Sequence, residues 1–132
     1  MNPDFSDLQG RNVIITGGGG VLCRSFAEAF LAAGARVALL DIRGDKAEEA
    51  AAALGRGAIG VEADVLSAAS LDAALAQVRS RLGPVDVLVN GAGGNVPSAT
   101  TGVERLQSVA DLDRSFFALQ AADFGRAFDL NF

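Results

Sequence analysis

The chain has 132 residues, half of them hydrophobic, and a formal net charge of −5 at pH 7. This composition is typical of one globular domain, and the negative charge disfavours nucleic acid as a partner. No apolar run approaches the ~20 residues of a membrane span, and residues 1–4 lack the character of a signal peptide. A single cysteine and no histidine exclude an internal disulfide and disfavour a metal site. We expect a cytoplasmic protein that binds neither nucleic acid nor a membrane.

The first predicted strand, residues 12–16, leads into four consecutive glycines at 17–20 and then into an amphipathic helix. Leu22, Phe26 and Phe30 are spaced four residues apart, so we expect them to share the buried face of this helix. A helix that follows directly on a glycine turn presents its free backbone amides to an anion.

A second strand is predicted at 36–40, ending at Asp41, and an Ala- and Glu-rich helix at about 45–54. The third strand is predicted at 58–62, and the third helix begins after Ser67. This last helix places four apolar residues on one side, namely Leu71, Leu75, Val78 and Leu82.

A fourth strand is predicted at 85–89, which is almost entirely apolar, as a central parallel strand should be. Strands that alternate with helices predict an α/β fold of the Rossmann type, a doubly wound parallel sheet. Right-handed crossovers give the strand order 3-2-1-4, with the sheet incomplete toward the C-terminus. Ligands of such folds bind at the carboxyl ends of the strands, so the turns at 16–20, Asp41, Asp64 and 90–94 should line one crevice.

Residues 91–121 have no clear period, and this length predicts a loop or insertion with a functional role rather than an ordinary connection. A last helix is predicted to start within 122–132, capped by Asp123. We interpret residues 1–132 as a single dinucleotide-binding domain that contains this insertion.

The glycine turn at 17–20 is the strongest candidate for phosphate binding. Glycines let the backbone approach an anion closely, and the helix start offers amide donors. The same turn could serve NAD, FAD or S-adenosylmethionine, while the flanking strand and helix disfavour a merely flexible turn.

Asp41, at the end of the second strand, can accept hydrogen bonds from both hydroxyls of an adenosine ribose and would repel a 2′-phosphate. Its alternative role is to cap the following helix. Arg43 is the type of residue that binds a 2′-phosphate. Asp41 therefore favours NAD as the cofactor, but Arg43 leaves NADP open. Asp64, after the third strand, could bond an adenine edge or cap the next helix.

Three further features have alternatives. The small residues at 90–94 let the chain pass beneath a flat ligand, although a tight turn would have the same composition. Cys23 lies where a helix N-terminus can activate a thiol, but a buried packing role is favoured. Phe116 and Phe117 are expected to pack in the core or in a lid rather than to stack on a ligand.

Five short motifs follow one another along the chain: Thr16 with the glycines 17–20, Leu40-Asp41, Asp64-Val65, Asn90-Gly91-Ala92-Gly93, and Asn131. They resemble the N-terminal half of the classical short-chain dehydrogenases/reductases. The stretches 17–23, 90–101 and 116–132 are further similar to the branch of D-mannonate oxidoreductases, also called fructuronate reductases.

The resemblance implies a Rossmann fold and NAD(P)-dependent hydride transfer, here between D-mannonate and D-fructuronate. It implies a homo-oligomer, a dimer or tetramer, for the complete protein. It implies that Asn131 anchors a proton-relay water. The alternative is that Asn131 is only a polar residue on an ordinary helix. The residues assigned to the cofactor are Thr16, Gly17, Gly18, Gly19, Gly20, Val21, Leu22, Asp41, Ile42, Arg43, Asp64, Val65, Asn90, Gly91, Ala92 and Gly93.

The chain departs from the family pattern in three ways. The usual second and third glycines of the turn are Val21 and Cys23, and the second asparagine of the usual Asn-Asn-Ala-Gly is Gly91. The resemblance implies that the family's serine and Tyr-x-x-x-Lys pair lie after Phe132, and the chain contains no tyrosine that could replace theirs. General acid–base catalysis contributes about 10²–10⁴-fold, so we expect these residues to be inactive alone, as half of a longer dehydrogenase. The alternative is a non-catalytic module, complete at 132 residues, that binds a dinucleotide or a partner chain.

Overall fold

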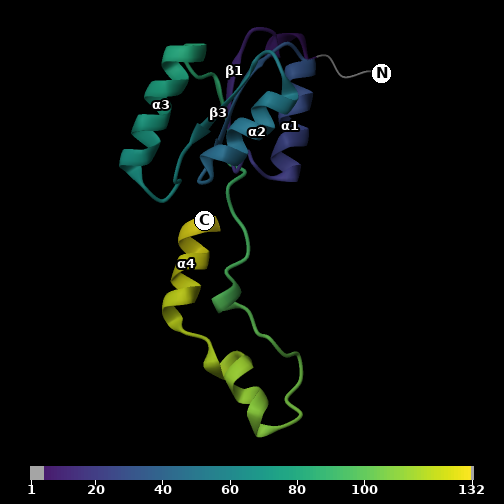
Figure 1. Ribbon diagram of the computed structural model, residues 1–132, viewed down its shortest axis with the longest axis vertical. Helices are drawn as coiled ribbons and strands as arrows, with labels where there is room; N and C mark the ends of the chain where they lie inside the picture. The colour runs from purple at the N-terminus through teal and green to yellow at the C-terminus, as the bar shows by residue number, and fades with distance from the viewer. Residues whose placement is uncertain (1–4, 132) are drawn as a thin grey trace. The chain divides into compact units, whose positions relative to one another are not determined.

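Four parallel strands form the sheet of the computed structural model, which describes residues 5–131 (Figure 1). The strands are β1 (Asn12–Thr16), β2 (Arg36–Asp41), β3 (Ala58–Glu62) and β4 (Val87–Val89). Their order, β3-β2-β1-β4, confirms the Rossmann type of sheet and the strand order predicted from the sequence. Because all neighbouring strands are parallel, their carboxyl ends meet at one edge.

Helices cover both faces of this sheet. The helices α1 (Val21–Ala32) and α2 (Gly44–Leu54) pack on one face, and α3 (Ala68–Leu82) packs on the other. Successive residues of a strand point to opposite faces, so β1 divides its side chains between two cores. Val13 and Ile15 belong to the core under α1 and α2, and Ile14 belongs to the core under α3.

The buried face of α1 differs from the predicted one. Leu22 and Phe26 are 66% and 41% exposed, whereas Cys23 and Ala27 are buried and Phe30 is packed against the core in part. The prediction is therefore wrong for Leu22 and Phe26. The reason is the close approach of α1 to the sheet, where small side chains fit and large ones do not.

The helix α3 follows its prediction more closely. The hydroxyl of Ser67 accepts the Ser70 N–H at 3.3 Å and caps the helix. Val78 and Leu82 are buried, and Leu75 packs against the same core in part. The apolar side predicted from the spacing is thus the side that faces the sheet.

Of the described residues, 5–92 form a first compact unit and 93–131 a second. The second unit contains three short 3-10 helices and one α-helix: η2 (Pro97–Ala99), η3 (Val109–Arg114), η4 (Phe116–Ala118) and α4 (Ala121–Asn131). The segment expected to be a loop or insertion, 91–121, therefore has local helical structure. The interpretation of residues 1–132 as one dinucleotide-binding domain stays a prediction.

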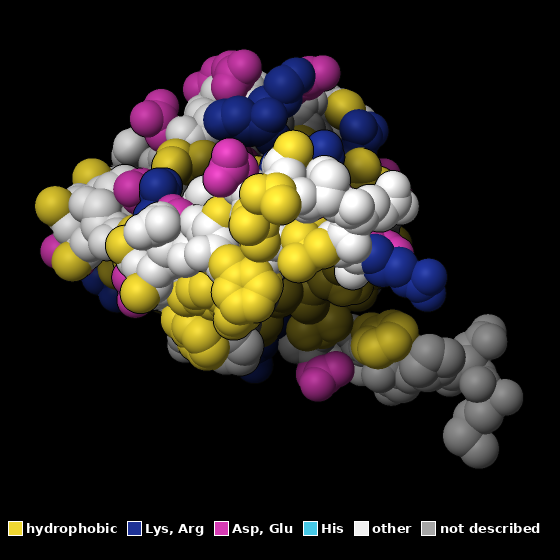
Figure 2. All heavy atoms as spheres, turned by 90° about the horizontal axis from the view of Figure 1, so that it is seen from below, with side chains coloured by type: hydrophobic (Ala, Val, Ile, Leu, Met, Phe, Trp, Pro, Cys, Tyr) yellow, Lys and Arg dark blue, Asp and Glu magenta, His cyan; other side chains and the backbone are white. Residues whose placement is uncertain are grey.

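Two expectations about this second unit are corrected. The helix α4 begins at Ala121, so Asp123 lies inside its first turn and is not its cap, and the Asp123 N–H donates to the Gln120 carbonyl at 3.0 Å. Phe116 and Phe117 are 66% and 77% exposed, with their rings edge to face at 6.1 Å, so neither packs in a core, and a place in a lid stays a prediction. A 3-10 segment of three residues offers too little surface to enclose them. Hydrophobic side chains gather on the face that Figure 2 draws.

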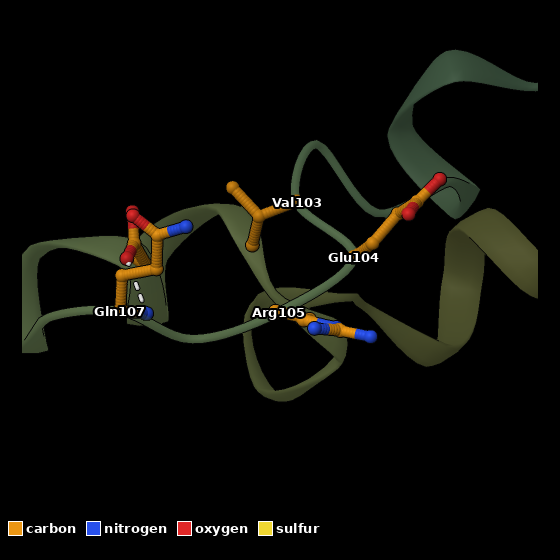
Figure 3. Close-up of a pocket in the computed structure, with 5 residues that line it drawn as sticks. Val103, Glu104, Arg105 and Gln107 are labelled. Carbon is orange, nitrogen blue, oxygen red and sulfur yellow. Dashed lines mark hydrogen bonds between the residues drawn. The ribbon is translucent and has the colours of Figure 1, made fainter.

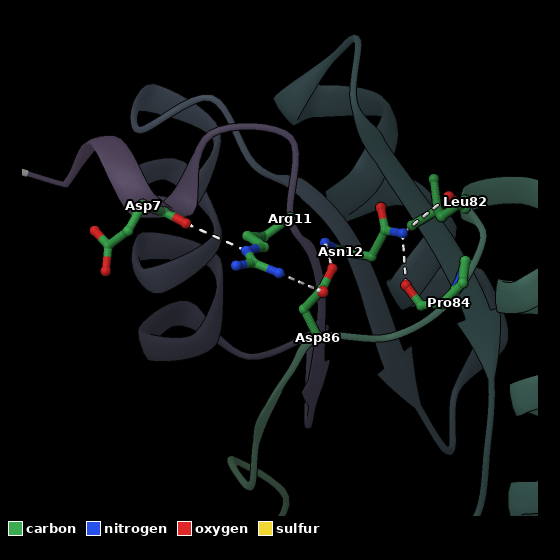
Figure 4. A network of polar contacts seen from close by, with 6 residues as sticks. All are labelled: Asp7, Arg11, Asn12, Leu82, Pro84 and Asp86. Atoms are coloured by element: carbon green, nitrogen blue, oxygen red, sulfur yellow. Dashed lines mark hydrogen bonds and ion pairs between the residues drawn. The ribbon is translucent and has the colours of Figure 1, made fainter.

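A polar network joins the start of β1 to the segment between α3 and β4 (Figure 4). The Asp86 carboxylate accepts the Asn12 N–H and an Arg11 guanidinium N–H, both at 2.9 Å. The Asn12 side-chain amide donates to the carbonyls of Leu82 and Pro84 at 3.0 and 2.6 Å. Because a carboxylate, and not a strand carbonyl, accepts the Asn12 N–H, β4 begins at Val87 rather than at the predicted residue 85.

Replacing Asp86 with asparagine should give a destabilisation that depends on pH. The Asn12 N–H and then the Arg11 guanidinium hold the pKa of the Asp86 carboxyl below its ordinary value. A carboxyl with a lowered pKa in the folded state stabilises above its unfolded pKa, and this contribution is lost as the pH falls through the folded pKa. The urea midpoints of wild type and Asp86→Asn should therefore differ most near neutral pH and converge in acid. A difference independent of pH would contradict this ion pair.

Candidate functional site: a glycine turn at the carboxyl edge of the sheet

The glycine turn is held by one backbone hydrogen bond to β2 and by another within the turn. The Gly18 N–H donates to the Leu40 carbonyl at 2.9 Å, and the Gly20 N–H donates to the Gly17 carbonyl at 3.0 Å. Gly17 has a φ of +69°, and a Cβ at this position would come within 2.6 Å of the Gly91 carbonyl oxygen. The turn therefore requires glycine at Gly17 for both its conformation and its space.

Asp41 connects this turn to β2. Its side chain is 11% exposed, and its Oδ2 accepts the Gly19 N–H at 2.9 Å while its Oδ1 accepts the Arg43 N–H at 3.0 Å. The cap position of α2 is Arg43, and its side chain makes no capping bond, so Asp41 does not cap that helix. Each carboxylate oxygen retains a second lone pair, so Asp41 can still accept from further hydroxyl groups.

The N-terminus of α1 offers donors to an anion. Gly20 is the cap residue, and the first amides of the helix, at Val21, Leu22 and Cys23, have no carbonyl acceptor inside the helix. The first turn of α1 contains no acidic residue, and Val21 and Leu22 are 88% and 66% exposed. Together with the helix dipole, these amides form a site suited to a phosphate group.

Thr16 holds the end of β4 beside this turn. Its hydroxyl accepts the N–H groups of Gly91 and Ala92 at 3.1 and 3.0 Å. Thr16 is buried and Asn90 is exposed. The structure thus places Thr16 and 90–92 together, as the parallel pairing of β1 and β4 predicts.

Cys23 is buried between these two strand ends. Its Sγ lies 3.5 Å from the Thr16 carbonyl oxygen and 3.7 Å from the Gly91 carbonyl oxygen. Burial, and then the Asp41 carboxylate, raise the pKa of the Cys23 thiol above its ordinary value. Activation by the helix N-terminus would require a lowered pKa, so the packing role favoured from the sequence fits the structure better.

The remaining predicted residues of the first unit surround the ends of β2 and β3. Ile42 is 65% exposed, and the Arg43 Nε lies 3.9 Å from Asp41 Oδ1. Asp64 Oδ1 accepts the Leu66 N–H at 2.9 Å, and Ser67 rather than Asp64 caps α3, which leaves the adenine-edge role of Asp64 as a prediction. Val65 is half-buried.

Lys46, in the first turn of α2, was not among the site residues predicted from the sequence. A Cβ built on Gly19 would lie 3.0 Å from the Lys46 Cβ, so the lysine side chain starts beside the turn. Lys46 is the single lysine of the chain, but its position five residues after Asp41 does not by itself indicate that it lies beside the glycine turn.

Gly93 and Asn131 belong to the second unit. The Asn131 Oδ1 accepts the Gly94 N–H at 3.0 Å, and its Nδ2 donates to the carbonyls of Gly94 and Ala127 at 3.1 and 2.7 Å. The side-chain amide of Asn131 therefore binds the backbone of its own unit. Its role as the anchor of a relay water stays a prediction, and so does the role of Gly93 at the cofactor.

The protein-family model for short chain dehydrogenases matches residues 11–131 of this chain. The chain belongs to the short-chain dehydrogenase family. An uncharacterized oxidoreductase of Bacillus subtilis (strain 168), UxuB, is 38% identical over the whole chain and 48% of its own length. The 7alpha-hydroxysteroid dehydrogenase of Escherichia coli (strain K12) is 35% identical over 99% of the chain and 46% of its own length. The chain thus spans about half the length of these relatives.

Solved structures of the short-chain dehydrogenases agree with this assignment. A Haemophilus influenza protein, provisionally named a D-mannonate oxidoreductase and crystallised with NAD, has a TM-score of 0.86 and 33% identity over 97% of this chain and 48% of its own. The 3-ketoacyl-(acyl-carrier-protein) reductase of Brucella melitensis, complexed with NADH, has a TM-score of 0.72 and 29% identity over 94% of this chain and 45% of its own.

Outside the predicted site, the second unit of this short-chain dehydrogenase chain has a surface pocket of about 420 Å³ (Figure 3). Its lining is mostly polar and consists of Val103, Glu104, Arg105, Gln107 and Asp111. Asp111 Oδ2 accepts the N–H groups of Gln107 and Ser108, both at 2.9 Å, so its carboxylate is engaged in the local fold. None of the predicted cofactor residues lines this pocket.

Two further observations concern metal binding and membrane spans. Within residues 5–131, no group of three or more His, Cys, Asp and Glu side chains is arranged to hold a metal ion. Over the same described residues, no helix combines the length and the apolar character needed to cross a membrane.

Proposed function

We propose that this chain is the cofactor-binding half of an NAD-dependent oxidoreductase that interconverts D-fructuronate and D-mannonate. The observation that carries the cofactor assignment is Asp41, whose carboxylate lies at the end of β2 and accepts the Gly19 N–H of the glycine turn. A carboxylate in this position beside a helix N-terminus is the arrangement that accepts ribose hydroxyls next to a bound pyrophosphate.

The residues present fit a dinucleotide. The turn has no room for side chains at Gly17 and Gly18, whose Cβ atoms would come within 2.6 Å of Gly91 and Leu39. The amides of Val21 and Leu22 bind the pyrophosphate, and Asp41 accepts the ribose hydroxyls while its charge disfavours a 2′-phosphate. Asp64 and Val65 flank the adenine, and Asn90, Ala92 and Gly93 border the adenosine-ribose and nicotinamide side. A bound nicotinamide cofactor supplies the hydride.

The substrate proposal rests on the relatives. The Haemophilus influenza protein named a D-mannonate oxidoreductase is similar over 97% of this chain. Its name supports a keto sugar acid as the substrate, and the family supports a homo-oligomer for the complete protein. Asn131 anchors the relay water, while the proton-transfer tyrosine has no counterpart among the 132 residues. We therefore expect NAD⁺ binding without turnover from the chain alone.

The test is calorimetric titration of the 132-residue chain with NAD⁺, for wild type and Val21→Asp. Val21 is 88% exposed. A carboxylate in the first turn interacts favourably with the helix dipole and stabilises the helix, but it repels a pyrophosphate. We expect an unchanged or higher melting temperature and about a tenfold or greater loss of NAD⁺ affinity. Ser25→Asp, an equal charge change at an exposed position about one turn (~5.4 Å) farther along α1, is the matched control and should lose less.

An absence of NAD⁺ binding in wild type would overturn the cofactor proposal. Equal losses for Val21→Asp and Ser25→Asp would show that the α1 amides do not bind the pyrophosphate. For the substrate, a longer protein that contains this chain should oxidise NADH with D-fructuronate. Failure there, with NAD⁺ still bound, would overturn the substrate proposal and leave the cofactor proposal in place.

A further inference from the structure

Cys23 and Gly91 share one small space between the ends of β1 and β4. A Cβ built on Gly91 would overlap the Sγ of Cys23 and come within 2.7 Å of the Thr16 carbonyl oxygen, while lying 3.9 Å from the Cys23 Cβ. The conflict at Gly91 therefore involves the sulfur atom and not the rest of the cysteine. A side chain at position 91 would therefore meet the Cys23 thiol and the Thr16 carbonyl, and only the first of these contacts depends on the residue at position 23.

Both residues depart from the pattern that the sequence resembles, which has a glycine at position 23 and an asparagine at position 91. The geometry makes these departures one compensated change, because the space that Cys23 fills on α1 is the space that Gly91 leaves open after β4. Val21, the other departure in the turn, is 88% exposed and takes no part.

The backbone after β4 is held from two sides. The Thr16 hydroxyl accepts the amides of Gly91 and Ala92, and the Cys23 thiol donates toward the carbonyls of Thr16 and Gly91, 3.5 and 3.7 Å away. A thiol is a weak donor with one proton, so its contribution lies in contact as much as in hydrogen bonding. The amides of Gly91 and Ala92 are thus oriented by β1, and the Gly91 carbonyl is oriented by α1.

We propose that Cys23 and Gly91 are a matched pair in which Cys23 is a positioning residue for the 90–92 turn at the cofactor. This rests on the proposed function, which places 90–92 beside the nicotinamide half of the cofactor. The pair has two separable consequences. The stability effects of substitutions at 23 and 91 are coupled, and so are their effects on NAD⁺ affinity.

The experiment is a double-mutant cycle on the 132-residue chain with Cys23→Ala, Gly91→Ala and the double variant. Melting temperature and the dissociation constant for NAD⁺ are the two readouts. We expect Gly91→Ala to weaken NAD⁺ binding about tenfold in the wild-type background and less than about threefold in the Cys23→Ala background. The melting temperature should recover by several degrees in the double variant, about 5 °C. Rescue is partial because the Thr16 carbonyl remains close to position 91.

Two control substitutions make the cycle specific. Gly17→Ala also approaches the Gly91 carbonyl, at 2.6 Å, but no cysteine atom is among its closest contacts, so Cys23→Ala should not relieve its penalty. Cys23→Ser retains a hydrogen-bond donor and should hold NAD⁺ affinity closer to wild type than Cys23→Ala does.

Additive effects of Cys23→Ala and Gly91→Ala in both readouts would overturn the pair. Coupling in the melting temperature without coupling in NAD⁺ affinity would overturn the positioning role and leave a packing contact. If wild type binds no NAD⁺, the proposed function and the positioning role fail together, while coupled or additive melting temperatures still decide whether Cys23 and Gly91 are matched.

Discussion

Replacing Asp41 with serine should turn a preference for NAD⁺ into one for NADP⁺. The Asp41 carboxylate is held beside the glycine turn by the N–H groups of Gly19 and Arg43, where its charge opposes a 2′-phosphate. Hydrogen bonds to a charged group contribute about 1.5–3 kcal/mol, so the loss of NAD⁺ affinity should be on the order of 10- to 100-fold.

The gain for NADP⁺ comes from residues already present. The Arg43 Nε lies 3.9 Å from Asp41 Oδ1 and its side chain is 65% exposed, so removing the carboxylate frees a guanidinium for the 2′-phosphate. Lys46 starts beside Gly19, but its ammonium group is paired with the Glu49 carboxylate at 2.7 Å, so the gain rests on Arg43.

Titration of Asp41→Ser with both cofactors measures the exchange, and Asp64→Ser is the matched control. It removes the same charge after β3, where the carboxylate accepts the Leu66 N–H rather than an amide of the glycine turn. Asp64→Ser should leave the ratio of the affinities for NAD⁺ and NADP⁺ nearly unchanged. An unchanged ratio in Asp41→Ser would remove Asp41 from the ribose role and leave it the structural task of holding Gly19.

Thr16→Val should be the most destabilising isosteric change at this site. The Thr16 hydroxyl is the acceptor for the N–H groups of Gly91 and Ala92, and valine keeps the shape while removing that acceptor. An unpaired donor costs about 1–3 kcal/mol when it is fully buried. Because Gly91 is exposed and Ala92 is half-buried, we expect the free energy of unfolding to fall by about 1–3 kcal/mol in total. This is a large share of the 5–15 kcal/mol that is typical of a folded domain.

Urea denaturation of wild type, Thr16→Val and Thr16→Ser measures this effect. Serine retains the hydroxyl, so Thr16→Ser should lie within about 1 kcal/mol of wild type. NAD⁺ affinity should also fall in Thr16→Val, because the 90–92 turn loses its anchor. If Thr16→Val and Thr16→Ser are equally stable, the two hydrogen bonds do not contribute to stability as the geometry indicates.

Local periodicity was sufficient for much of the fold. The bounds of β1 and β3 agree with the predicted strands, and Ser67 caps α3 as its position before an apolar helix indicated. Strand order followed from the right-handedness of parallel crossovers and was confirmed. Segment 91–121 resisted prediction because short 3-10 helices have no apolar repeat long enough to detect.

By itself, the sequence determined the four parallel strands, the position of the glycine turn before α1 and the meeting of Thr16, Asp41 and 90–92 at one edge of the sheet. These follow from short-range pattern and from general rules of chain topology. Only the tertiary structure decided that Cys23 and Ala27, not Leu22 and Phe26, face the sheet. It also decided that Asp41 bonds Gly19 and that Cys23 meets Gly91. The physical reason is distance along the chain: these contacts join residues 22 and 68 positions apart, where close packing rather than local preference selects the partner.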